Sequence, residues 1–198
     1  MDDKKIILVL NMGMKSIRSI IFDSEGNKLA TAAVPIETSL VGEMVTQQPN
    51  EWWEKAGCVI RQTLDEVGYV EVDFLTVTTS SSCLLGVDES GNALMPCMMV
   101  SDRSARKESD MLDQMPSFQK IKEKTGLAAD SSLMIPKALW VKNVRHDVFE
   151  KVYKFIAPND YLLAKFTGRY VTDYLNAYTP QSLCRRTSHR RTDRQSVP

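Results

Sequence analysis

The chain has 198 residues, of which 43% are hydrophobic and 25% charged, as expected for one ordinary globular domain. Its formal net charge is zero, which gives no electrostatic reason to expect nucleic acid or an anionic membrane as partner. No apolar run approaches the roughly 20 residues of a membrane helix, and the first residues lack the pattern of a secretory signal. The four cysteines form no Cys-Xaa-Xaa-Cys pair, so we expect no zinc site or disulfide framework, and a cytoplasmic protein.

Two apolar runs, residues 6–10 and 17–22, flank a small polar turn around Gly13. This pattern predicts two strands joined by a tight hairpin. Glycine lets backbone N–H groups approach a ligand closely, and donors that converge on a turn can hold phosphate. The turn adds donors and positive charge from Lys15, Ser16 and Arg18. Two interpretations stay open at this point, a phosphate cradle and a structural hairpin with a solvated loop.

A third strand is expected at residues 28–35, followed by a loop over 37–48. Helical spacing of apolar residues predicts a helix over 50–67, with Asn50 as its N-cap and Gly68 as its stop. Two further strands are expected at 74–79 and 84–87, paired with each other across a run of three serines.

The second half of the body is expected to alternate helices with short strands. The predicted elements are a strand at 93–100, helices at 103–115, 117–124 and 136–143, a strand at 154–157 and a helix ending at Phe166. Gly126 and Gly168 should end helices, and Asn159 or Asp160 should cap the last one. Strands first, then alternating elements, predict an α/β layer structure with a mixed sheet.

The sequence changes character at residues 178–198. This tail carries five arginines, no lysine and one acid, Asp193, which gives it a charge of +4 and leaves −4 for residues 1–177. Apolar residues become sparse, so the tail is expected to be non-globular. The abrupt change from lysine to arginine favours a frameshifted read-through over a basic interaction tail or a disordered remnant.

Five segments of the body follow one another in a recognisable order. They read GMKSIRSIIFD, EWWEKAGCVI, LLGVDESGNALMPCMMVSDRSA, IPKALWVKN and FIAPNDYLLAKFTGRYVTDYLNA. Together they resemble the FGGY carbohydrate kinases, over about residues 6–177. The resemblance implies the ribonuclease H-like (actin-like ATPase) fold, an α/β domain with a mixed β-sheet flanked by helices. It also implies that residues 1–177 are part of the first of two domains that close over ATP and a sugar.

The resemblance implies that the first hairpin faces the phosphates of ATP and Mg²⁺. The cofactor-binding positions it assigns are Asn11, Gly13, Met14, Lys15, Ser16 and Arg18. Asn11 replaces the family's aspartate and Met14 its usual threonine. Asparagine loses a charge, and a unit-charge pair at 4 Å is worth up to about 4 kcal/mol at an effective dielectric near 20. Asn11 is therefore expected to be a weak metal position, in a loop that either contacts phosphate or no longer binds nucleotide.

The resemblance places sugar contacts on two further segments. The substrate-binding positions it implies are Ser80, Ser81, Ser82, Asp102 and Arg103. The serines offer hydroxyl donors and acceptors to a polyol, or they form only a polar strand edge. Asp102 could accept from a sugar hydroxyl, cap the following helix, or do both. A structural role is expected for Asp173 and Asn176.

The resemblance assigns no catalytic residue to this chain, since the family's aspartate base lies downstream. We therefore expect the amino-terminal part of an ATP-dependent kinase for a small sugar or polyol, of pentulose or polyol type, inactive as an isolated piece. The alternatives are a non-catalytic sugar-binding or regulatory module and an actin-like structural or interaction domain. A homodimer through the face left exposed by the missing part is a further expectation.

Overall fold

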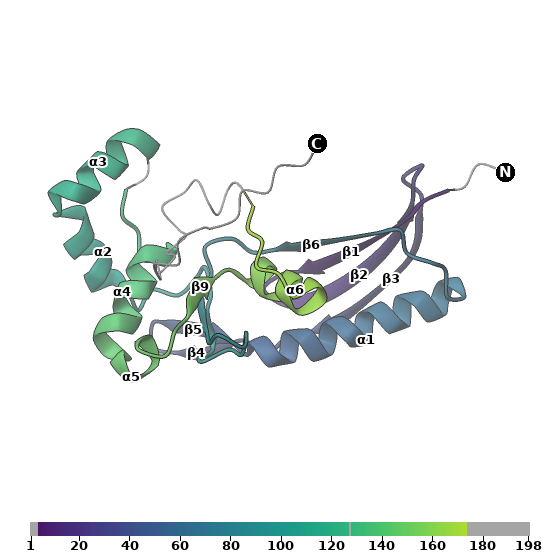
Figure 1. Ribbon diagram of the computed structural model, residues 1–198, viewed down its shortest axis with the longest axis horizontal. Helices are drawn as coiled ribbons and strands as arrows, with labels where there is room; N and C mark the ends of the chain where they lie inside the picture. The colour runs from purple at the N-terminus through teal and green to yellow at the C-terminus, as the bar shows by residue number, and fades with distance from the viewer. Residues whose placement is uncertain (1–3, 127, 174–198) are drawn as a thin grey trace, which may run out of the picture.

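The computed structural model describes residues 4–126 and 128–173. Its main sheet has the strand order β3-β2-β1-β6 (Figure 1). The strands β1 (Ile6–Met12), β2 (Ser16–Asp23) and β3 (Lys28–Pro35) run antiparallel to one another. The strand β6 (Phe74–Thr79) lies parallel to β1 on its other side. The predicted opening hairpin, third strand and mixed sheet are therefore confirmed.

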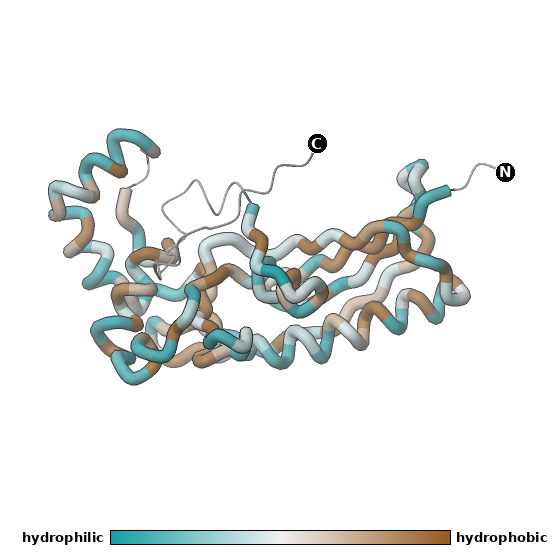
Figure 2. Tube along the Cα trace, viewed as in Figure 1, coloured by the Kyte–Doolittle hydropathy of each residue, from teal (hydrophilic) through white to brown (hydrophobic). Residues whose placement is uncertain are grey.

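One face of this sheet forms the core. Alternate residues of β1, Leu8, Leu10 and Met12, are buried, as are Ile17 and Ile21 of β2. The helices α1 (Pro49–Val67) and α6 (Pro158–Thr167) pack against strands of this sheet and against each other (Figure 1). Figure 2 shows apolar stretches along the strands, whereas α1 alternates apolar and polar residues along its length. This is the pattern of a helix with one buried face.

The opposite face of the sheet is less covered. The alternate residues Ile7, Val9, Ile20 and Phe22 are only partly buried, and Phe74 on β6 is 59% exposed. An apolar face of this kind is typical of a surface that another element or partner covers.

The ends of α1 show where the sequence signals were right and wrong. Gly68 ends the helix with φ of 80°, in the left-handed region that favours glycine, as predicted. The N-cap is Gln48 rather than Asn50, because Pro49 already occupies the first helical turn. The Asn50 side chain instead accepts a hydrogen bond from the Tyr161 hydroxyl at 3.2 Å, which joins α1 to α6.

The segment 37–48 is not a loop, as the sequence suggested. It forms a hairpin of β4 (Ser39–Val41) and β5 (Met44–Gln47), and β8 (Cys97–Met98) extends it to a three-stranded sheet. The strand expected at 93–100 is thus reduced to two residues and an isolated bridge. The strand β4 has only three residues, all of them exposed, so it is too short to show the alternation that marks a half-buried strand.

The expected pairing of 74–79 with 84–87 is also wrong. The strand β7 (Leu85–Val87) pairs with β9 (Lys154–Ile156), whereas β6 pairs with β1. Between β6 and β7, Ser82 has φ of 59°, so the chain leaves the direction of β6 there. The serine run therefore connects two sheets rather than two strands of one hairpin.

Four helices gather at one end of the molecule (Figure 1). They are α2 (Arg106–Asp113), α3 (Pro116–Thr125), α4 (Met134–Val144) and α5 (His146–Phe149). A second core forms there from buried residues of α4, of β8 and of the segment just before β7, among them Leu84, Met98 and Val141. The helices expected at 103–115, 117–124 and 136–143 are present with shifted ends.

The last described helix, α6, begins after Ala157 rather than at Asn159 or Asp160. Asp160 still serves the helix start, because its carboxylate accepts from the Ala157 N–H at 3.1 Å. Gly168 and Gly126 end their helices with φ of 68° and 70°, as predicted. Over the described part of the chain, no helix combines the length and apolarity needed to cross a membrane. Asn176 and the basic tail lie outside the described residues.

Candidate functional site

Two of the sequence-predicted segments meet at one edge of the main sheet. In the parallel pair of β1 and β6, Met12 is the register partner of Thr79, and these are the last residues of the two strands. The hairpin turn follows Met12, and the serine run follows Thr79. Ligands of open α/β sheets bind at the carboxyl ends of parallel strands, so the arrangement places both segments where a ligand is expected.

The hairpin turn is closed by its own backbone. The Gly13 N–H donates to the Ser16 carbonyl at 3.0 Å, and the Lys15 carbonyl accepts from the Ile36 N–H at 3.0 Å. A Cβ placed on Gly13 would have the Ser16 carbonyl oxygen as its nearest neighbour, at 3.8 Å. The space beside Gly13 is thus open, which suits close approach of a ligand.

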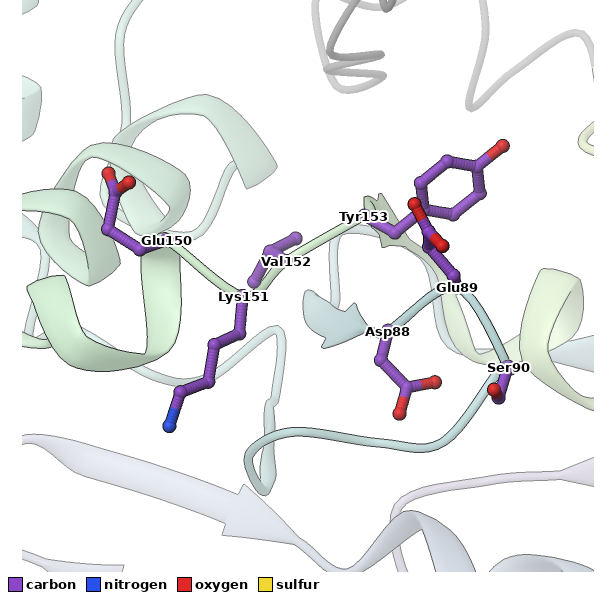
Figure 3. Close-up of a pocket in the computed structure, with 7 residues that line it drawn as sticks. All are labelled: Asp88, Glu89, Ser90, Glu150, Lys151, Val152 and Tyr153. Carbon is purple, nitrogen blue, oxygen red and sulfur yellow. The ribbon is translucent and has the colours of Figure 1, made fainter.

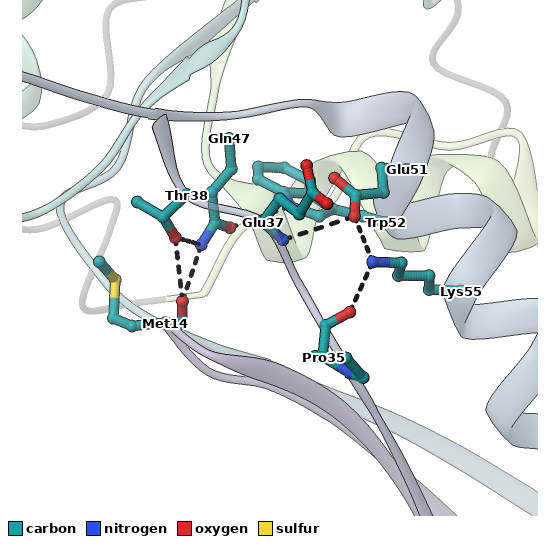
Figure 4. Close-up of polar contacts among 8 residues, drawn as sticks. All are labelled: Met14, Pro35, Glu37, Thr38, Gln47, Glu51, Trp52 and Lys55. Carbon is teal, nitrogen blue, oxygen red and sulfur yellow. Dashed lines mark hydrogen bonds and ion pairs between the residues drawn. The ribbon is translucent and has the colours of Figure 1, made fainter. Parts of the chain in front are cut away.

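Gln47 of β5 anchors this turn from outside the main sheet (Figure 4). Its side-chain Nε2 donates to the Met14 carbonyl at 2.9 Å and to the Thr38 hydroxyl at 2.9 Å. Its Oε1 accepts from the indole Nε1 of the buried Trp52 at 3.0 Å. Sequence reasoning missed Gln47 because the segment was expected to be a loop. Its position two residues before the Pro49 that starts α1 was the only available signal.

A second group of contacts joins the end of β3 to α1 (Figure 4). The Lys55 ammonium contacts the Glu51 carboxylate and donates to the Pro35 carbonyl at 2.5 Å. Glu51 also accepts from the Glu37 N–H at 3.4 Å. These contacts fix the segment that leaves β3 just behind the hairpin turn.

Asn11 and Arg18 are cross-strand partners on the less covered face of the sheet. The Arg18 side chain is exposed, and its Nε lies 3.4 Å from the Ser16 hydroxyl. Residues 11–18 carry two cations, Lys15 and Arg18, and no carboxylate. Arginine and lysine beside an open turn fit the phosphates of ATP, which the resemblance implies. A neutral amide beside a guanidinium does not fit Mg²⁺, which prefers carboxylate oxygens.

The three serines differ in exposure. Ser81 is exposed, Ser80 is half-buried and Ser82 is buried. The positive φ of Ser82 places a non-glycine residue in the left-handed region, which costs of order 1–3 kcal/mol and requires support from surrounding contacts. Ser81 is therefore the serine whose hydroxyl is most accessible to a ligand.

Asp102 is fully buried and its carboxylate is engaged by backbone and side-chain donors. The Oδ2 atom accepts from the Val45 N–H at 2.8 Å, and Oδ1 accepts from the Ser104 N–H at 3.0 Å and hydroxyl at 2.5 Å. The N-cap of α2 is Ala105, so Asp102 holds the turn before the helix rather than capping it. The half-buried Arg103 donates from Nη1 to the Val100 carbonyl at 3.0 Å.

A buried lysine lies behind these segments. Lys137 of α4 is inaccessible to solvent, and its Nζ donates to the carbonyls of Ser82, Met99 and Ser132 at 2.7, 2.6 and 2.7 Å. Burial lowers the pKa of Lys137 to about 8. Sequence reasoning did not single out this residue, because a lysine on a helix is usually exposed.

Two buried thiols lie near this ammonium. Hydrogen bonding to Cys97 lowers the pKa of the Cys83 thiol, whereas burial raises the pKa of Cys97 well above its usual value. Both are free thiols, as is Cys58.

The start of α6 carries a buried carboxyl. Burial raises the pKa of Asp160 to about 6, and the charge of Asp173 adds to this rise. The Asn159 side-chain amide donates to Asp173 at 3.1 Å. This contact gives Asp173 a structural partner, in line with its expected role.

A surface pocket of about 380 Å³ lies between the turn after β7 and the chain that joins α5 to β9 (Figure 3). Its lining residues are Asp88, Glu89, Ser90, Glu150, Lys151, Val152 and Tyr153. None of them was a predicted site residue. Within residues 4–126 and 128–173, no group of three or more histidine, cysteine or acidic side chains is arranged to hold a metal.

The mixed sheet with helices packed on one face is an α/β domain consistent with the actin-like ATPase fold. The sequence model described as the FGGY family of carbohydrate kinases, N-terminal domain, matches residues 6–183, so the chain belongs to this family. The match continues past residue 177, where the charge pattern changes.

Individual relatives agree with this assignment. The chain is 19% identical to a xylulose kinase of Staphylococcus xylosus, with 84% of this chain and 35% of the relative covered. It is 29% identical to an autoinducer-2 kinase of Klebsiella pneumoniae, with 87% and 34% covered. A solved structure described as a "xyloylose kinase" from Brucella ovis superposes with a TM-score of 0.83 at 20% identity, covering 89% of this chain and 36% of that one. The chain thus spans about a third of the length of these relatives.

Proposed function

We propose that this chain forms the sugar-binding side and part of the phosphate-binding side of an ATP-dependent carbohydrate kinase. The observation that carries the proposal is the meeting of the hairpin turn and the serine run at the carboxyl ends of β1 and β6, in a chain of this family. The names of two relatives, a xylulose kinase of Staphylococcus xylosus and a glycerol kinase of Thermococcus onnurineus, support a pentulose or polyol as the class of substrate. The protein itself is proposed to act in the cytoplasm.

In this proposal ATP, when bound, supplies the γ-phosphoryl group that is transferred to a sugar hydroxyl. The open turn at Gly13 lets the backbone approach the phosphates, and Lys15 and Arg18 contribute positive charge. Ser80 and Ser81 hydrogen-bond the sugar hydroxyls. Arg103, whose Nη1 donates to the Val100 carbonyl at 3.0 Å, completes the polar surface on the sugar side.

The experiment is calorimetric titration of residues 1–198 with D-xylulose and with glycerol. We expect binding of at least one of them, reduced about tenfold by Ser81→Ala, because the accessible hydroxyl is lost. Ser90→Ala is the matched control, because Ser90 lies in the surface pocket lined by Asp88 and Glu89, which we call the acidic pocket. This variant should leave binding unchanged. Absence of binding, or an equal loss in both variants, would contradict the sugar-binding role.

We further propose that residues 1–198 alone do not turn over sugar. Phosphoryl transfer to a hydroxyl needs a base that receives the proton, and the family resemblance assigns none to this chain. The chain also covers only about a third of its kinase relatives. A coupled assay of ADP release with a panel of pentuloses and polyols should give no signal above background. Robust turnover would refute this part of the proposal.

A non-catalytic sugar-binding or regulatory module is the second candidate function. The neutral Asn11 beside Arg18 favours it, since this pair opposes a divalent cation. Titration with Mg-ATP separates the candidates, because the regulatory module would bind sugar and the kinase portion would bind both ligands.

An interaction role is the third candidate, and the partly exposed apolar face around Phe74 supports it. We propose that a second copy of the chain covers this face when residues 1–198 are isolated. Light scattering should then show a dimer that Phe74→Lys converts to a monomer. A clean wild-type monomer at high concentration would contradict self-association.

A further inference from the structure

We propose that Lys137 is a positioning residue of the sugar site, whose buried ammonium fixes the serine run against the loop that carries Asp102 and Arg103. Its effect on sugar binding rests on the proposed function. Its effect on the position of the two segments rests on the geometry alone. The effect on sugar binding and the effect on the segments can therefore fail separately.

The ammonium joins three segments that are distant in sequence. Lys137 lies on α4, and its Nζ reaches the Ser82 carbonyl at 2.7 Å and the Met99 carbonyl at 2.6 Å. A third bond, to the Ser132 carbonyl at 2.7 Å, ties the ammonium to the start of its own helix. An ammonium has three donors and no acceptor, so each donor has a carbonyl partner.

Lys137 acts where the backbone ladder ends. Leu84 and Met98 exchange two backbone hydrogen bonds, at 2.9 and 2.8 Å. Ser82 precedes this bridge on one segment and Met99 follows it on the other, so both residues lie just beyond the last paired backbone groups. The lysine supplies the connection that backbone groups no longer make.

The Met99 carbonyl links the ammonium to the loop that carries Asp102 and Arg103. It also accepts from the Asp102 N–H at 3.0 Å, and the Asp102 carboxylate in turn accepts from the Val45 N–H. The ammonium, Met99 and Asp102 therefore form one path from the serine run to β5. A shift of the ammonium would move both sugar-side segments.

The choice of a charged residue is informative. Burying an ammonium has a large desolvation cost, and well-packed apolar residues often replace buried ions without loss of stability. The strained backbone of Ser82 needs a fixed partner, and the ammonium provides one. Lys137 thus fixes the position of these segments, and its removal would leave the Ser82, Met99 and Ser132 carbonyls without this donor.

The test compares Lys137→Met, which keeps a long unbranched side chain and removes the donors, with two controls. Lys142→Met changes an exposed lysine of the same helix. Gly86→Ala destabilises the neighbouring β7 by overpacking, because its Cβ would lie 2.7 Å from Val152, while Lys137 stays intact. Hydrogen exchange and calorimetric titration with D-xylulose and glycerol are measured on all of them.

We expect amide exchange at residues 81–85 and 99–104 to accelerate at least tenfold in Lys137→Met, with β1 and β2 unchanged. Sugar affinity should fall at least tenfold in Lys137→Met, and should be retained in Gly86→Ala and Lys142→Met. Lys137→Gln, which keeps two donors, should give intermediate values and replaces Lys137→Met if the latter does not fold.

Unchanged exchange in both segments of a folded Lys137 variant would overturn the inference. So would unchanged affinity in a variant whose wild-type parent binds sugar. If the wild-type chain binds neither sugar, the proposed function fails, and the exchange data still decide whether Lys137 holds the two segments together.

Discussion

The hairpin turn and the serine run lie at the same edge of the main sheet, yet they are held in different ways. The turn is held by the neutral amide of Gln47, which reaches it from a neighbouring hairpin and also accepts from Trp52. The serine run is held by the buried charge of Lys137. Neither anchor is a predicted site residue, and both come from elements outside the main sheet.

Each half of the site therefore depends on a different kind of contact. A neutral amide costs little to bury when its hydrogen bonds are satisfied, so the turn depends on hydrogen bonds alone. The serine side combines the buried ammonium of Lys137 with the buried carboxylate of Asp102. Removal of either charged group therefore leaves buried polar groups without partners. We therefore expect larger effects on the serine side than on the hairpin side.

The largest effect is expected for Asp102→Ala. It leaves the N–H groups of Val45 and Ser104 without their acceptor in a buried region, which should lower the free energy of unfolding by about 3–5 kcal/mol. Urea unfolding measures it, and Asp110→Ala on the exposed side of α2 is the control. A loss below about 1 kcal/mol would show that the serine side is not the more tightly held half.

Gln47→Leu tests the hairpin side. The Trp52 indole N–H loses its acceptor, and the Met14 carbonyl keeps only the longer hydrogen bond from the Thr38 hydroxyl at 3.3 Å. We therefore expect a loss of about 2–3 kcal/mol in the free energy of unfolding. Gln48→Ala is a close control, because Gln48 is exposed and its side chain makes no capping hydrogen bond. Equal effects in the two variants would remove Gln47 as an anchor.

The buried carboxyl of Asp160, at the start of α6, should make the stability of the protein depend on pH. Its pKa is about 6, above the usual value of 3.8, so the stability it contributes is present below about pH 4 and is lost as pH rises through 6. The free energy of unfolding of the wild type should fall by roughly 2–3 kcal/mol over this window relative to Asp160→Asn. If the free energy of unfolding of the two proteins varied with pH in parallel, Asp160 would not be the group that titrates in this window.

The smallest effect concerns Asn11 and leaves the fold unchanged. Asn11→Asp restores a carboxylate beside the turn, so Mg-ATP should bind about tenfold more tightly, which corresponds to about 1.4 kcal/mol. Binding of ATP without metal should weaken or stay the same, because the new charge repels phosphate. Calorimetry with both ligands measures the difference. An equal gain for metal-free ATP would contradict a metal role at this position.

The sequence predicted the parts of this structure that depend on local signals. The two apolar runs around Gly13 predicted β1 and β2. The glycines at 68, 126 and 168 acted through a backbone preference for positive φ that holds in any context. The pairing of β7 with β9 and the β4–β5 hairpin depend on tertiary contacts, and the serine run gave no sign of the turn at Ser82.

The candidate site was predicted only in part for a similar reason. The resemblance named residues on the ligand side, such as Ser81 and Arg18, which are exposed in the structure. Gln47 and Lys137 do not face the ligand side; they donate hydrogen bonds to the backbone of the hairpin turn and of the serine run. These contacts form only when β5 and α4 have packed beside those segments. A polar residue buried by tertiary packing leaves no periodic pattern in a sequence.

The most direct test of a sugar site at the carboxyl ends of β1 and β6 is a map of amide chemical shifts in residues 1–198 during titration with D-xylulose and glycerol. We predict shifts at residues 80–82 and 103, and none at the acidic pocket around Asp88 and Tyr153. Shifts confined to the acidic pocket, or no shifts with either ligand, would contradict this location of the site.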